Sequence, residues 1–166
     1  EEELSGMDTS ALVGHLAAWN YFMSLDTSDN AEFVNAWHKF IKSQKRVTND
    51  PMEAHYIGFN MWAQAVTNAG TTEPEAVQDA LIGISVPNLS GGYSTMMPNH
   101  HITKPVLIGE IQDDGQFEVV WETKGLVAGD AWSDYLPESA KLFSSWAKPF
   151  SCGAFNVDTK KCSGIN

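Results

Sequence analysis

Two runs of alternating apolar and polar residues, separated by a short polar segment, most constrain the fold of this chain. The runs are KPVLIGEI, residues 104–111, and FEVVWET, residues 117–123, and the segment between them is QDDGQ. Alternation with a period of two indicates strands. Gly115 can adopt the positive φ that a tight turn requires, and Asp114 before it is a favoured turn residue. We therefore predict an antiparallel hairpin over residues 104–123.

Three segments between residues 29 and 82 predict helices. The first follows a capping residue at position 29 or 30. Its apolar residues recur at helical spacing and are expected on one face: Phe33, Val34, Trp37, Phe40 and Ile41. The second helix begins near Pro51 and ends at Gly70, and the third runs from Pro74 to about residue 82, because proline favours the first helical turn. A further short helix is predicted within residues 139–150.

An apolar run, VGHLAAWNYF, occupies residues 13–22 and is followed by the polar segment SLDTSDN. This pattern predicts a buried strand that ends in a loop. Trp19, Asn20 and Tyr21 lie near the exit of that strand, where we expect them at the wall of a cleft. The alternative is that Trp19 and Tyr21 only pack the connection that follows.

The charge balance excludes several classes of partner. The chain of 166 residues has 21 acidic and 10 basic residues, a formal net charge of −11. Nucleic-acid binding requires clustered Lys and Arg, and the compact basic runs are limited to residues 42–46 and 160–161. No stretch approaches the roughly 20 consecutive apolar residues of a membrane-spanning helix. We expect a globular protein that binds no nucleic acid and does not span a membrane.

The polar motifs do not predict a catalytic or metal centre. His100 and His101 are adjacent, and neighbours on an extended chain point to opposite faces, so they are poorly placed to bind one ion together. We expect one of them to be hydrogen-bonded inside and the other solvated at a bend. Asp113 and Asp114 lie at the predicted turn, where aspartate bonds nearby backbone. We predict no catalytic residue, no metal and no cofactor.

The two cysteines, Cys152 and Cys162, lie close together in a tail rich in Gly, Asn and Lys. A disulfide between them would close a small loop and stabilise the fold by about 2–3 kcal/mol. Free thiols are the alternative, whereas a metal site would need two more ligands nearby. A disulfide would favour an oxidising compartment outside the cytoplasm.

Four stretches together resemble one known family. They are VGHLAAWNYF, KRVTNDPMEAHYIGFNMW at 45–62, the run from VPNLSGG to FEVVWET at 86–123, and AWSDYLP at 131–137. They closely resemble the urea-type substrate-binding proteins of ABC transporters, which belong with the amide-binding and branched-chain amino acid-binding proteins. The resemblance extends from Glu1 to the cysteine-containing tail.

The resemblance implies an α/β fold like that of type I periplasmic binding proteins, with two lobes, each a helix-flanked parallel sheet, and the ligand between them. A chain of this length corresponds to about the last two fifths of such a protein, so we expect a C-terminal portion. Residues 1–28 would form a second-lobe strand and a crossover, and residues 29–95 the helical part of the first lobe. Residues 96–166 would form the return crossover, the hairpin and the tail. Asn99, His100 and His101 would then lie at the hinge between the lobes.

The resemblance also implies a function. The protein would bind urea or a short-chain amide in the interlobe cleft, with Trp19, Asn20 and Tyr21 at the edge of the cleft. Closure by hinge bending would prepare delivery to an ABC transporter permease at the periplasmic side of the membrane. The alternatives are an amide-sensing regulatory protein of the same fold, a hydrolase of urea or amides, and a fragment that binds nothing.

Overall fold

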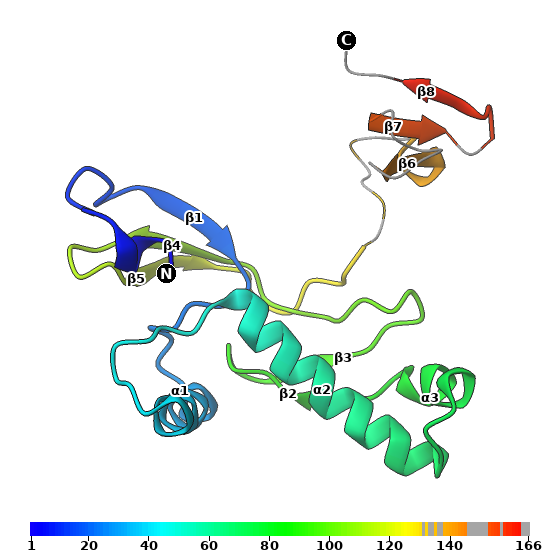
Figure 1. The fold of residues 1–166 in the computed structure, drawn as a ribbon, viewed down its shortest axis with the longest axis horizontal. Coiled ribbons are helices and arrows are strands. Elements are labelled where there is room, and N and C mark those ends of the chain that lie inside the picture. Colours follow the sequence, from blue (N-terminus) through cyan, green and yellow to red (C-terminus); the bar gives the residue numbers. More distant parts are fainter. Residues whose placement is uncertain (131, 133–134, 136–137, 146–152, 157, 164–166) are drawn as a thin grey trace. The chain divides into compact units, whose positions relative to one another are not determined.

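The computed structural model describes residues 1–130, 132, 135, 138–145, 153–156 and 158–163. These residues divide into two compact units, Glu1–Gly129 and Asp130–Asn166. The first unit contains a three-stranded sheet, three α-helices and a two-stranded sheet (Figure 1). The second unit contains a three-stranded sheet. All strand pairs among the described residues are antiparallel, so the parallel sheets that the resemblance implies do not lie within them.

The predicted hairpin is confirmed. Strands β4 (Leu107–Ile111) and β5 (Phe117–Glu122) pair in antiparallel register with a β-bulge between Ile108 and Gly109. Gly115 has a φ of 76°, the left-handed conformation that the turn required. Strand β1 (Leu16–Trp19) pairs antiparallel with β4, which gives the strand order β1-β4-β5.

One face of this sheet carries a hydrophobic core. The rings of Phe22 and Phe117 stack with their centroids 4.6 Å apart, and Phe22 also covers Gly109. The opposite face is partly exposed: Leu16 and Trp121 lie on it and are 62% and 52% exposed. Strand β1 lies at the edge of the sheet, and its Trp19 is 50% exposed. The prediction that this strand is buried was therefore wrong, because the apolar run does not show how many of its faces have a packing partner.

Helix α1 spans Ser28–Ile41, and its N-cap lies two residues before the first predicted cap. Thr27 is the N-cap, and its Oγ1 accepts a hydrogen bond from Asn30 N at 3.1 Å. Asn30 is instead buried, and its side chain donates to the carbonyl oxygens of Met23 and Leu25. The apolar face of the helix is also narrower than predicted, since Phe40 is 80% exposed.

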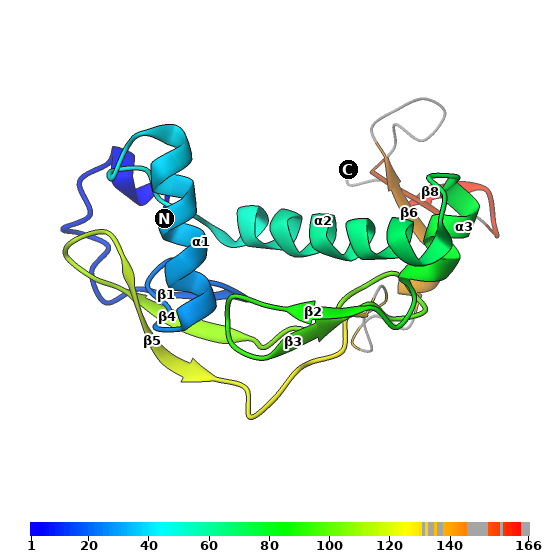
Figure 2. The same cartoon turned by 90° about the horizontal axis from the view of Figure 1, so that it is seen from below.

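Helices α2 (Asp50–Ala69) and α3 (Pro74–Leu81) begin and end as predicted. Asn49 caps α2 by accepting from Met52 N at 3.0 Å, and Gly70 ends it with a φ of 67°. Figure 2 shows α2 running along strands β2 (Ser85–Pro87) and β3 (Tyr93–Thr95). A second hydrophobic core joins these elements, formed by Ile57, Met61, Ala65, Val77 and Ile84.

The second unit contains a short 3₁₀ helix (Ser139–Lys141) and strands β6 (Leu142–Ser145), β7 (Gly153–Asn156) and β8 (Lys161–Ser163). The helix predicted within residues 139–150 was wrong for residues 142–145, which form a strand. Their pairing with β7 provides an interstrand partner that a local pattern does not reveal. Cys152 lies outside the described residues, so its disulfide with Cys162 stays a prediction.

Candidate functional site

Three connecting segments lie side by side at one end of the sheet of β1, β4 and β5. They follow β1 at Asn20, precede β4 at Lys104 and Pro105, and follow β5 at Val127. Asn20 Nδ2 donates to the Pro105 carbonyl oxygen at 2.6 Å. The main chains of Lys104 and Val127 exchange two hydrogen bonds of 3.1 and 2.8 Å. We call this group of residues the crossover cluster.

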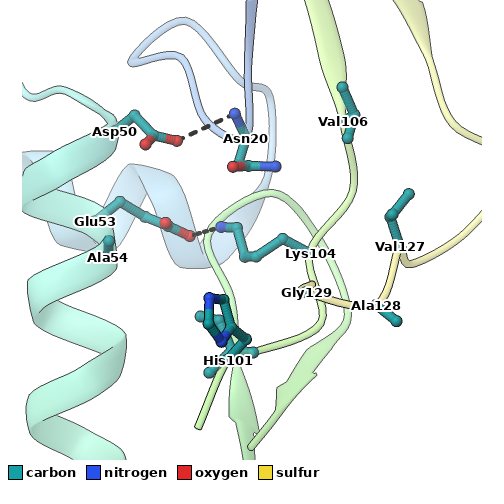
Figure 3. Close-up of a pocket in the computed structure, with 11 residues that line it drawn as sticks. Asn20, Asp50, Glu53, Ala54, His101, Lys104, Val106, Val127, Ala128 and Gly129 are labelled. Atoms are coloured by element: carbon teal, nitrogen blue, oxygen red, sulfur yellow. Dashed lines mark hydrogen bonds and ion pairs between the residues drawn. The ribbon is translucent and has the colours of Figure 1, made fainter. Parts of the chain in front are cut away.

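A cavity of about 280 Å³ lies beside the crossover cluster (Figure 3). The first turn of α2 forms one wall, and the connections that contain Lys104 and Val127 form the facing walls. The polar side chains that line it are Asn20, Asp50, Glu53, His101 and Lys104. Ala54, Ile102, Val106, Val127 and Ala128 provide its apolar surface. The cavity thus combines a largely apolar lining with a few polar groups, as small-molecule sites commonly do.

The innermost polar group of the cavity wall is Glu53, which is fully buried. Its Oε1 pairs with Lys104 Nζ and accepts from Leu89 N at 3.3 Å. Its Oε2 has no hydrogen-bond partner. Burial raises the pKa of Glu53, and the opposing effect of Lys104 does not cancel that rise. The arrangement is therefore a buried ion pair that keeps one carboxylate oxygen unsatisfied.

Asp50 lies one helical turn before Glu53 on the same side of α2, because residues three apart are neighbours on a helix surface. Its Oδ1 accepts a hydrogen bond from Asn20 N at 3.1 Å (Figure 3). Burial is the largest cause of the raised pKa of Asp50. Asp50 is only partly buried, and its carboxylate lines the cavity together with that of the fully buried Glu53.

The three predicted cleft residues do not lie in one site. Asn20 lines the cavity beside the crossover cluster, whereas Trp19 and Tyr21 line a separate cavity of about 120 Å³. Tyr21 is 1% exposed, and its hydroxyl donates to Asn30 Oδ1 at 2.7 Å and lies 2.7 Å from Thr48 Oγ1. These contacts are those of a side chain that packs the connection after β1.

The three predicted hinge residues lie in a turn before Lys104. His100 N donates to the Met97 carbonyl oxygen at 2.9 Å, and His100 has a φ of 60°. Asn99 Nδ2 donates to the Gly129 carbonyl oxygen at 2.9 Å, which links this turn to the connection after β5. Both histidines are exposed, so the expectation that one of them is inside was wrong. Within the described part of the chain, no group of three or more His, Cys, Asp or Glu is placed to hold a metal ion.

The sequence pattern did not select the main polar groups of this cavity. From the pattern, Asp50 and Glu53 were predicted only as residues that favour the start of a helix. Lys104 was predicted only as the first residue of the strand segment 104–111. The one available signal was a pair of acidic residues three positions apart in an otherwise apolar helix. That signal is also produced by any solvated first turn.

Comparison with known proteins identifies the family. Residues 1–138 match the family described as periplasmic binding protein domain. The chain belongs to this family. The match includes the whole first unit and therefore all residues of the crossover cluster.

Solved structures of periplasmic binding proteins share the fold of this domain. One is the solute-binding protein of an ABC transporter from Rhodopseudomonas palustris HaA2 in complex with p-hydroxybenzoic acid, with 23% identity, a TM-score of 0.61, and coverage of 71% of this chain and 33% of that one. Another is the solute-binding protein of an ABC transporter from R. palustris in complex with benzoate. It has 15% identity and a TM-score of 0.66, and the match covers 79% of this chain and 36% of that one. The expected type I periplasmic binding protein-like fold is confirmed.

One curated relative of this periplasmic binding protein domain is named as a hydroxylase and not as a binding protein. It is a limonene hydroxylase from Geobacillus stearothermophilus, 31% identical over 118 residues, which are 71% of this chain and 21% of that protein. The chain thus spans about a fifth of that relative and about a third of the two solved proteins. Among the described residues, no helix has both the length and the apolar content needed to cross a membrane.

Proposed function

We propose that this chain is part of the solute-binding component of an ABC importer, which binds urea or a short-chain amide and delivers it to a permease. The observation that carries the proposal is the cavity at the crossover cluster, where Asp50 presents a carboxylate beside the side chains of Asn20 and Lys104. The family assignment supports the transport role, and the residues of the cavity support the class of solute.

Urea and short amides are neutral molecules rich in N–H donors, with one carbonyl acceptor. In a site closed to water, each of these groups needs a partner, because an unmade hydrogen bond costs more than a formed one contributes. Asp50 is suited to accept an N–H of the solute, and the ammonium of Lys104 is suited to donate to its carbonyl oxygen. We propose Asp50 and Lys104 as solute-binding residues, together with Asn20.

The charge of the cavity favours a neutral solute over an anion. Asp50 and Glu53 contribute two carboxylates, whereas Lys104 contributes one ammonium group that is already paired with Glu53. A benzoate, of the kind bound in the solved relatives, would bring a third carboxylate into this cavity. Like charges in a poorly solvated site repel each other, so we expect weak binding of aromatic acids.

The crossover cluster also supports a hinge-bending mechanism. Connecting segments that lie together can act as a hinge, about which the two lobes of such a protein rotate while the interior of each lobe stays packed. We propose that Asn99, His100 and His101 are hinge-region residues, since Asn99 bonds to the connection after β5. Closure would exclude water from the solute, and the closed form would dock on the permease in the periplasm.

Calorimetric titration of the full-length polypeptide tests this proposal. Urea, acetamide, leucine and 4-hydroxybenzoate are titrated separately under one buffer condition. Saturable binding of urea or acetamide, with weak or no binding of the other two, is the expected result. Preferential binding of 4-hydroxybenzoate would contradict the proposed solute class but not the family. Ammonia release during the urea titration would instead favour the hydrolase alternative.

A further inference from the structure

The Glu53–Lys104 ion pair joins two parts of the first unit that the sequence separates by 51 residues. Glu53 belongs to the first turn of α2, whereas Lys104 belongs to the connection between β3 and β4. The side chains of Glu53 and Lys104 are 0% and 9% exposed. Figure 3 shows the two side chains pointing toward each other across the cavity wall.

Stability alone does not account for this pair. Removing two charges from water costs several kcal/mol per ion, and their attraction repays that cost only when the remaining polar atoms are also satisfied. Glu53 Oε2 has no partner, and the pKa of Glu53 is raised by burial, so the carboxylate is less well stabilised here than in water. Well-packed apolar side chains in both positions would therefore stabilise the fold about as well.

The position of Lys104 within the crossover cluster suggests what the pair does. The main chain of Lys104 holds Val127 through two hydrogen bonds, and Pro105, the next residue, accepts from Asn20. A displacement of Lys104 would thus move the connections that follow β1 and β5 as well. Glu53 holds Lys104 against α2, which also carries Asp50.

We infer that Glu53 and Lys104 are a positioning pair, which fixes the three connections against helix α2 and so sets the geometry of the cavity. The role of Glu53 is to hold Lys104 in place, and solute contact is left to Asp50, Asn20 and the ammonium of Lys104. This inference concerns how the cavity is held, and its effect on solute affinity rests on the proposed function.

Five proteins test the inference: the wild type, Glu53→Met, Lys104→Met, the double variant with both substitutions, and Lys104→Arg. Each single methionine variant leaves one buried charge without its partner, and we expect its thermal midpoint to fall by on the order of 10 °C. The double variant removes both charges, so its midpoint is expected to return close to that of the wild type. Exposed Glu75→Met and Lys124→Met are the matched controls and are expected to change little.

Hydrogen exchange separates positioning from stability. The amide of Val127 donates to the Lys104 carbonyl oxygen at 2.8 Å. In the double variant we expect this amide to exchange about 10-fold faster, although the thermal midpoint has recovered, because the connections are no longer held against α2. Unchanged exchange at Val127 would overturn the inference, whether or not any solute binds.

Titration with urea adds a readout of the cavity. We expect the double variant to bind about 10-fold more weakly than the wild type, and Lys104→Arg to retain binding, because a guanidinium can also reach Glu53 Oε2. Equal affinity of the double variant and the wild type would overturn the inference and would also remove Lys104 from the proposed solute-binding residues, whereas binding of urea by the wild type would still support the proposed class of solute. Failure of the wild type to bind urea or acetamide would contradict the proposed function, and the exchange at Val127 would still decide the inference.

Discussion

The side-chain amide of Asn20 donates a hydrogen bond of 2.6 Å to the carbonyl oxygen of Pro105, which lies 85 residues later in the chain. The main-chain nitrogen of Asn20 donates at the same time to Asp50. One residue thus connects the end of β1, the start of α2 and the entrance to β4. This relationship brings the predicted cleft residue Asn20 to a cavity that its sequence neighbours Trp19 and Tyr21 do not line.

Substitution of Asn20 by alanine is expected to affect both folding and binding. The Pro105 carbonyl oxygen would lose its donor, which costs about 1–2 kcal/mol of the free energy of unfolding. Urea affinity is expected to fall at the same time, since Asn20 lines the cavity. Guanidinium denaturation and calorimetric titration measure the two effects. Exposed Asn35→Ala is the matched control, and equal behaviour of the two variants would contradict the role given to Asn20.

Gly109→Ala is expected to destabilise the first unit. A Cβ at this position would lie 2.7 Å from Phe22 Cζ and 3.0 Å from Phe117 Cβ, so the stacked rings would have to move. We expect a loss of about 1–3 kcal/mol in the free energy of unfolding. Gly58→Ala in α2 is the control, because a Cβ there meets no atom within 4 Å. That variant should be neutral or more stable by up to about 1 kcal/mol.

Tyr21→Phe distinguishes the two interpretations of Tyr21. Loss of the hydroxyl removes the hydrogen bonds with Asn30 and Thr48 in a buried site. We expect the free energy of unfolding to fall by about 1–3 kcal/mol, with urea affinity close to that of the wild type. Exposed Tyr93→Phe is the control. An unchanged stability with a marked loss of affinity would show instead that Tyr21 contacts the solute.

The buried carboxyl groups predict how stability depends on pH. Burial raises the pKa of Asp50 and of Glu53 in the folded protein. In the unfolded chain their pKa values are the ordinary ones, about 3.9 and 4.3. At a pH between the ordinary and the raised values, the folded protein therefore binds more protons than the unfolded chain. The contribution of these two groups to stability is therefore largest below that window and falls as pH rises through it. Guanidinium denaturation at a series of pH values measures the slope.

Asp50→Asn provides the comparison for that slope. The amide cannot titrate, so the decrease of stability with rising pH should be smaller in this variant than in the wild type. The opposite result would be a free energy of unfolding that increases with pH more steeply in the wild type than in Asp50→Asn. It would mean that folding lowers the pKa of Asp50. Exposed Asp79→Asn should leave the slope unchanged.

Local signals in the sequence were sufficient for most elements of the first unit. Pro51 and Pro74 mark helix starts and Gly70 and Gly115 mark a helix end and a turn, because each of these residues restricts or extends the backbone angles at its own position. The same signals did not show that Leu16 is exposed. Burial depends on which other elements cover a strand, and no local pattern contains that information.

The sequence by itself determined helices α1, α2 and α3, strands β1, β4 and β5 with the hairpin at Gly115 and, through its long motifs, the likeness to periplasmic binding proteins. Only the tertiary structure decided that Glu53 pairs with Lys104, that Asn20 rather than Trp19 or Tyr21 reaches the cavity, and that the predicted buried histidine is exposed. The physical reason is that backbone conformation follows from short-range sterics and capping. Ion pairing, desolvation and cavity geometry depend on groups that meet only after residues about 50 or more positions apart have packed together.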